Sequence, residues 1–175
     1  MLTFNPQATP TWDEPIDMLY ACHSKVKRFC AQLEMLPKYL AEHGLNPAAR
    51  DAITQICTYF NQAAPLHHDD EEQDFFPTLL HYAPQAQNQV DELNRQHQIL
   101  HENWTELHQI LSHVLNGNLS QCNPKIIQAF THAYAQHMAI EEPLFELGRQ
   151  HIPLAQQHAI GQIMAARRHP TFQAA

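Results

Sequence analysis

The sequence has few glycines and no long uncharged apolar run, and these two shortages narrow the fold class. Only four of the 175 residues are glycine, and the long segments repeat their apolar residues with helical spacing instead of alternating them as strands do. No apolar run reaches the ~18 residues that a membrane-spanning helix needs. We therefore expect an all-α protein that does not cross a membrane, folded as an up-down four-helix bundle with a short additional C-terminal helix.

Runs of basic residues and paired cysteines are also missing. The formal net charge is −8, and no run of lysine or arginine stands out. We therefore do not expect the chain to bind a nucleic-acid backbone or an anionic membrane surface. The four cysteines form no C-x-x-C pair and are too sparse for a disulfide scaffold. The N-terminus lacks the basic and apolar regions of a secretory signal. These absences together predict a cytoplasmic protein.

The chain divides into an N-terminal arm and one helical domain. Residues 1–12 carry two prolines and little pattern, so we expect an extended arm followed by a single domain at 13–170. Proline and glycine positions set the predicted helix ends, and Pro65 is expected to kink the second helix. The first predicted helix begins near residue 13, the second runs from about 47 to about 81, and the third runs from about 86 to about 115. The fourth begins near 124, and a short fifth helix spans about 153–168.

Histidine, by contrast, is abundant, with fourteen residues. Several histidines and two glutamates lie on the apolar faces of the predicted helices, where a buried carboxylate needs a partner and no lysine or arginine is available. Residues four apart share a helix face, so a His-x-x-x-Glu pair offers a nitrogen and an oxygen to one metal ion. Taken alone, His23 is better explained as a hydrogen-bonded core histidine than as a metal ligand. Taken together, the residues predict a dinuclear metal site with these ligands: His23, His67, Glu71, His97, His101, His137 and Glu141.

The stretch from residue 67 to residue 72 contains two overlapping His-x-x-x-Glu pairs. The helical rhythm that leads from Phe60 through Ala64 favours His67 with Glu71, and it places His68 and Glu72 toward the flank. We expect Asp69, Asp70 and Glu72 to be solvated or to support the ligands from outside. On this register, a His67→Ala variant should lose most metal binding, whereas His68→Ala should keep nearly all of it.

These motifs resemble those of the hemerythrin-like (HHE cation-binding) family. The matching segments are His23, His67-x-x-x-Glu71 with the following Glu72-Gln73-Asp74-Phe75-Phe76-Pro77, His97-x-x-x-His101, and His137-x-x-x-Glu141-Glu142. One departure is that oxygen-carrying hemerythrins have His-x-x-x-x-Asp in the last helix, where this chain has the His-x-x-x-Glu variant of bacterial relatives. The family pattern agrees with the His67/Glu71 register.

The resemblance implies a non-haem di-iron centre with an oxo or hydroxo bridge. By position, His97, His101 and His137 would hold one iron and His23 and His67 the other, while Glu71 and Glu141 would bridge the two. The iron with two histidines would keep an open position, where a small ligand binds.

Three functions are compatible with such a site. The leading hypothesis is a binding protein, not an enzyme, that binds dioxygen or another small diatomic ligand reversibly or senses it, acting with an unidentified redox or signalling protein. The alternative is a di-iron redox or repair protein that handles nitric oxide or peroxide or donates iron to damaged iron–sulfur clusters. A structural bundle with zinc is a third reading, because imidazole and carboxylate also bind zinc.

Overall fold

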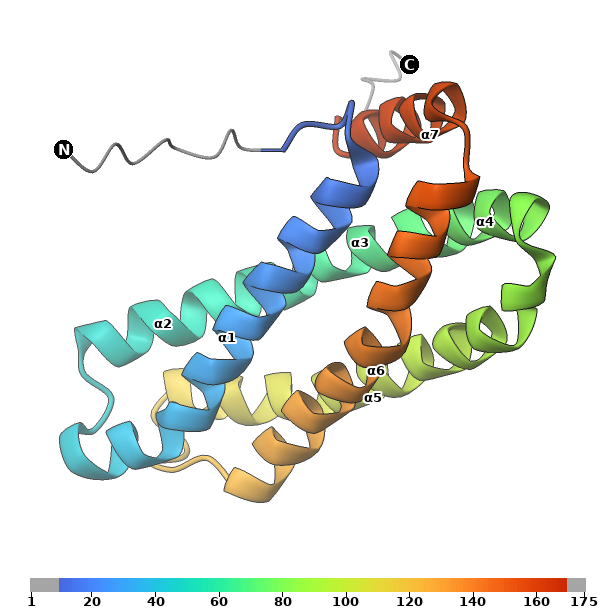
Figure 1. Ribbon diagram of the computed structural model, residues 1–175. Coiled ribbons are helices and arrows are strands. Elements are labelled where there is room, and N and C mark those ends of the chain that lie inside the picture. Colours follow the sequence, from blue (N-terminus) through green and yellow to red (C-terminus); the bar gives the residue numbers. More distant parts are fainter. Residues whose placement is uncertain (1–9, 170–175) are drawn as a thin grey trace, which may run out of the picture.

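The structure is a computed structural model that describes residues 10–169, and the regular secondary structure of that part is helical (Figure 1). Helices α1 (Pro15–His43), α5 (Gln87–Leu115) and α6 (Pro124–His151) are long, and α7 (Leu154–Arg167) is short. The fourth long segment is a continuous rod made of α2 (Pro47–Thr58), π-helix η1 (Tyr59–Ala63), α3 (Ala64–Asp70), π-helix η2 (Glu71–Phe75) and α4 (Phe76–Tyr82). A short 3₁₀ turn, η3 (Pro84–Ala86), leads into α5.

These helix ends agree with those predicted from the sequence, and local chemistry explains them. The Asn46 side chain accepts a hydrogen bond from the Ala49 N–H at 2.9 Å, and a proline follows each of the capping residues Asn46 and Asn123. An asparagine cap followed by proline is a favoured helix start. Gly44 and Gly117, with φ of 64° and 75°, follow the ends of α1 and α5. The expected arm at residues 1–12 lies mostly outside the described residues.

The rod does not break at its prolines but widens in front of them. Pro65 and Pro77 each come two residues after a π-helical segment, η1 and η2 respectively. A proline inside a helix cannot donate to the carbonyl four residues earlier, and its ring clashes with that carbonyl. In the wider turns the N–H of Ala64 donates to the Tyr59 carbonyl and that of Phe76 to the Glu71 carbonyl. The π turns therefore accommodate both prolines and keep the rod continuous.

The long helices enclose two separate apolar clusters. Helix α6 packs against α1 and α5, and α2 also contacts α1 and α5. One cluster, around Leu33, Ile53 and Phe130, fills the end where α2 begins. The other, around Phe75 and Phe145, fills the opposite end, where α7 lies across the start of α1 (Figure 1). No helix within residues 10–169 is long and apolar enough to span a membrane.

Candidate metal centre

A layer of buried polar side chains separates the two apolar clusters. On α1, His23 lies between Leu19 of one cluster and Val26 of the other, and on α5 His97 lies between Leu93 and Leu100. On the rod and on α6, buried polar residues likewise lie between residues of the two apolar clusters. Every long helical segment therefore contributes to the layer. Its buried members, each at most 3% exposed, are His23, His67, His68, Glu71, His97, His137 and Glu141.

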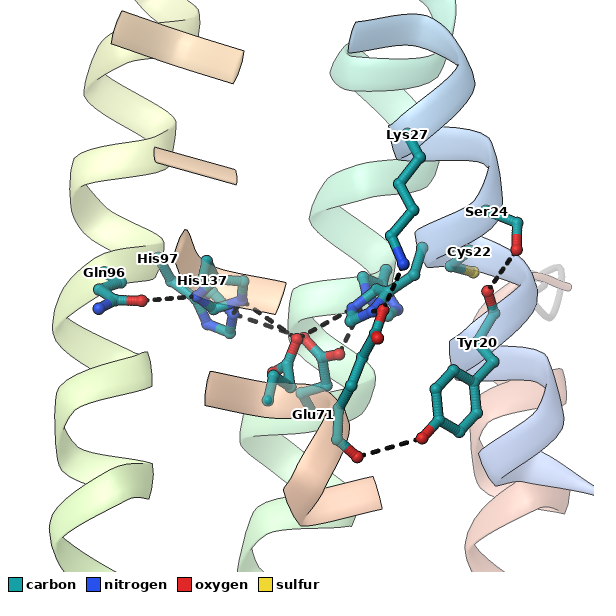
Figure 2. A network of polar contacts seen from close by, with 12 residues as sticks. Tyr20, Cys22, Ser24, Lys27, Glu71, Gln96, His97 and His137 are labelled. Carbon is teal, nitrogen blue, oxygen red and sulfur yellow. Dashed lines mark hydrogen bonds and ion pairs between the residues drawn. The ribbon is translucent and has the colours of Figure 1, made fainter. Parts of the chain in front are cut away.

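The layer contains two overlapping groups of potential metal donors. One is made of His68, Glu71, His97 and His137, and the other of His23, His67, Glu71 and Glu141. Within each group, one donor atom from every residue lies within 4.8 Å of all the others. Glu71 belongs to both groups, so the two sites adjoin and share a carboxylate. In Figure 2, Glu71 lies between His97 and His137 on one side and Lys27 and Tyr20 of α1 on the other.

Glu71 has the orientation of a bridging carboxylate. Its Oε1 lies 2.9 Å from His67 Nε2, and its Oε2 lies 3.4 Å from His97 Nε2. Each oxygen thus faces a different group. Despite these short distances, neither oxygen has a hydrogen-bond partner among the described residues. The carboxylate is placed between the imidazoles without the alignment that a hydrogen bond requires.

Glu141 approaches both groups from α6. Its Oε2 lies 3.0 Å from His23 Nε2 and 3.2 Å from His137 Nε2. Its Oε1 is buried and has no hydrogen-bond partner in the described part of the chain. The Nε2 atoms of His97 and His137 lie 3.2 Å apart, so the two imidazoles point toward one place from α5 and α6.

The buried atoms without partners fit a metal ion. His68 Nε2, both oxygens of Glu71 and Oε1 of Glu141 make no hydrogen bond within residues 10–169. Buried polar atoms are rarely left unsatisfied, and a carboxylate in an apolar interior is costly without a cation. Imidazole nitrogens and carboxylate oxygens suit iron, copper, nickel and zinc. The arrangement therefore fits a pair of such ions.

The electrostatics of the layer favour ionised carboxylates. Burial opposes their ionisation, but the imidazoles of His67 and His97 hold the pKa of Glu71 below its ordinary value. Burial likewise opposes ionisation of Glu141, and contacts with His137 and His23 hold its pKa well below the usual range. Both bridging candidates are thus anionic, as carboxylates that bind a metal must be.

The histidines differ in charge state. Burial and the neighbouring imidazole of His97 lower the pKa of His68 well below its ordinary value, which keeps His68 neutral and able to coordinate. Burial also disfavours the charged form of His97, but its contacts with the carboxylates of Glu71 and Glu72 outweigh burial and raise its pKa to about 9. In His67, the charge of Glu71 outweighs burial and raises the pKa well above the usual value. A metal ion must displace protons from these two rings.

Polar side chains outside the layer contact the Nδ1 atoms of several of its imidazole rings. His23 Nδ1 contacts Glu142 Oε1 at 3.1 Å, and His97 Nδ1 contacts Glu72 Oε1 at 2.6 Å. His137 Nδ1 contacts Gln96 Oε1 at 3.1 Å, as Figure 2 shows. Such contacts fix the tautomer that leaves Nε2 free to coordinate. This agrees with the expectation that Glu72 supports a ligand from outside. Lys27 in turn donates to Glu142 at 2.7 Å.

His101 and His68 lie differently from the sequence-based expectation. His101 belongs to neither donor group and is exposed; its Nε2 lies 2.9 Å from Nδ1 of His68. His68, expected on the flank, is 3% exposed and its ring stacks on His97 at 4.0 Å. The burial of His68 reflects the position of α3, which presents His67 to one donor group and His68 to the other. His67, four residues before Glu71, and His68, three residues before it, share its helix face but reach different groups.

Asp70, which was expected either to be solvated or to support the ligands from outside, is fully buried. Its partners are the guanidinium groups of Arg167 and Arg168 from α7. The sequence carried no signal for this pairing, since α7 lies almost a hundred residues later in the chain. A signal for His68 was present, because the His68/Glu72 pair has the same spacing as the chosen pair, but the helical rhythm favoured only one register.

Comparison with known proteins agrees with this geometry. The Hemerythrin HHE cation binding domain matches residues 14–147, which include every residue of the two donor groups. An uncharacterized protein of Haemophilus influenzae is 50% identical over 168 residues, covering 96% of this chain and 98% of that protein. The family match extends over most of the chain and ends before α7. The chain therefore belongs to the hemerythrin HHE cation-binding domain family.

Proposed function

We propose that the protein is a non-haem di-iron protein of hemerythrin type that binds dioxygen, or another small diatomic ligand, reversibly. The observation that carries this proposal is the shared Glu71, whose two oxygens face different donor groups and have no hydrogen-bond partner among the described residues. A carboxylate placed in this way is suited to join two metal ions. We further infer that the long helical segments form the up-down four-helix bundle of that family.

We assign the ligands by donor group. His68, His97 and His137 would hold one iron, and His23 and His67 the other, with Glu71 and Glu141 as bridges. In this assignment, His68 takes the place that the sequence-based expectation gave to His101. Bound iron would supply redox electrons, an oxo or hydroxo bridge and a position at which a diatomic ligand exchanges. We place that position on the side with two imidazoles, which has one nitrogen donor fewer.

The surroundings of the two-histidine side support binding without turnover. The ring of Phe145, which is fully buried, lies 5.0 Å from the ring of His23. Tyr20 contacts Phe145 edge-on at 5.1 Å and hydrogen-bonds to Glu142 and Glu146. We infer that the buried Phe145 ring limits the access of water, and of the protons that it delivers, to this side. A dry environment of this kind favours release of the bound ligand over further reaction.

An optical experiment tests the proposal. The protein is loaded with ferrous iron in the absence of air, analysed for two iron ions per chain, and then exposed to oxygen. We expect a visible ligand-to-metal charge-transfer band that disappears when oxygen is removed. Rapid and irreversible oxidation would instead favour the redox or repair alternative. A protein that retains zinc and rejects iron would overturn the di-iron assignment.

A further inference from the structure

Helix α7 lies outside the part of the chain that matches the family, yet it contacts the rod at η2, next to the metal centre. Its buried residues Ile160 and Met164 belong to the apolar cluster around Phe75. It packs closely on Trp12, just before α1, because a Cβ atom at Gly161 would lie 1.9 Å from the Trp12 carbonyl oxygen. Helix α7 is therefore fixed across the end of the bundle, as Figure 1 shows.

The end of α7 carries two arginines that reach the turn bearing Glu71. Arg167 donates through Nη1 to Asp70 and through Nη2 to Asp74 Oδ2, the latter at 2.6 Å. Arg168 donates through Nη2 to Asp70 Oδ2 at 2.6 Å. Both aspartates are buried, at 0% and 8% exposed.

These contacts bracket the π turn. Asp70 immediately precedes η2 and Asp74 lies near its end, so the single guanidinium of Arg167 spans the turn in which Glu71 is the first residue. A π turn is a rare backbone form that occurs mostly as a single turn, often at functional sites. The planar fork of arginine sets both the distance and the direction between its two partners.

The direction of Glu71 depends on the shape of this turn. Its two oxygens face His67 and His97, which come from different helices and belong to different donor groups. Ligand positions must hold to within ~0.5 Å for a site of this kind to work. A change of the π turn toward an ordinary α-helical turn would rotate Glu71 away from at least one group.

We propose that Arg167 is a positioning residue for the metal centre, because it joins Asp70 to Asp74 and so holds η2 in the shape that directs Glu71 at both donor groups. This inference rests on the proposed function for the metal centre itself. Arg168 supports the same contact through Asp70 and by placing its guanidinium carbon 4.2 Å from the centre of the Trp12 ring. Metal binding by the matched domain thus depends on a helix outside it.

The test compares Arg167→Lys with Arg149→Lys. Lysine keeps the positive charge near Asp70 but cannot join two carboxylates as a fork, and Arg168 still pairs with Asp70, so the variant is designed to fold. Arg149 bonds to Asp17 at 2.9 Å and joins α6 to α1 without bonding to the π turn, which makes it the matched control. The readouts are cobalt(II) affinity, the midpoint of thermal unfolding, and hydrogen exchange of the amides of residues 71–76 in metal-free protein.

We expect Arg167→Lys to weaken cobalt binding ~10–100-fold and to speed exchange at residues 71–76, with little change in the unfolding midpoint. Arg149→Lys should change neither affinity nor local exchange. Equal affinity and exchange in the two variants would overturn the inference. If the wild-type protein bound no cobalt, the proposed function would fail, and exchange alone would decide whether Arg167 holds the turn.

Discussion

Metal-free protein should lose stability as the pH rises from neutral to alkaline values, and His97 provides a measurable share of that loss. Contacts with the carboxylates of Glu71 and Glu72 outweigh burial and raise the pKa of this imidazole from 6.5 to about 9. The folded state therefore holds a proton that the unfolded chain releases near pH 6.5. A raised histidine pKa contributes stability that is complete below the unfolded value and disappears as pH rises through the folded one.

The size of the effect follows from the pKa shift. From 6.5 to about 9 is roughly 2.5 units, which corresponds to about 3 kcal/mol at 1.36 kcal/mol per unit. The assay is urea unfolding of metal-free protein at pH 6.5 and pH 9, for the wild type, His97→Gln and the exposed control His151→Gln. The wild type and the control should lose about 3 kcal/mol more than His97→Gln across this range. Equal losses in all three proteins would refute the argument that Glu71 and Glu72 hold a proton on His97.

Two further measurements follow from the site and the core. His68→Ala should remove one of the two bound metal ions, whereas His101→Ala should weaken metal binding only ~10–100-fold, as loss of a supporting contact does. Metal analysis of both variants tests this, and a greater loss of metal in His101→Ala would contradict the ligand assignment. Burial raises the pKa of the Cys30 thiol to about 12 and the pKa of the Cys57 and Cys122 thiols to about 11. A thiol reagent at pH 8 should therefore modify one cysteine in the native protein and four after unfolding. Rapid modification of more than one would show that the core opens. The protected thiols are those of Cys30, Cys57 and Cys122, and the reactive one is Cys22.

The sequence predicted the helices well because their ends depend on local chemistry. Asparagine caps, prolines in first turns and glycines with positive φ act within a few residues of where they stand. The apolar stripes were equally readable and led directly to His23, His97 and His137. The predicted kink at Pro65 appears as a π turn in front of the proline, because a wider turn also removes the clash.

The parts that could not be predicted depend on neighbours distant in the chain. A helical rhythm assumes one buried stripe, but α3 has donor groups on two sides, so His67 and His68 are both buried. His101 follows the rhythm of α5 and still lies outside the groups, beside His68. The buried state of Asp70 required arginines from α7, and no local pattern indicates that pairing.

We expect the shared Glu71 to couple the occupancy of the two proposed metal sites. Its buried carboxylate already faces both donor groups, so an ion in one group partly neutralises the charge that an ion in the other group also needs. Because the two cations also repel each other, the second ion should bind more weakly than the first. With half the metal needed, we therefore expect singly loaded chains to predominate, a distribution that native mass spectrometry would distinguish from a mixture of empty chains and chains with a full pair. Supply of the metal would then fill the protein in two steps.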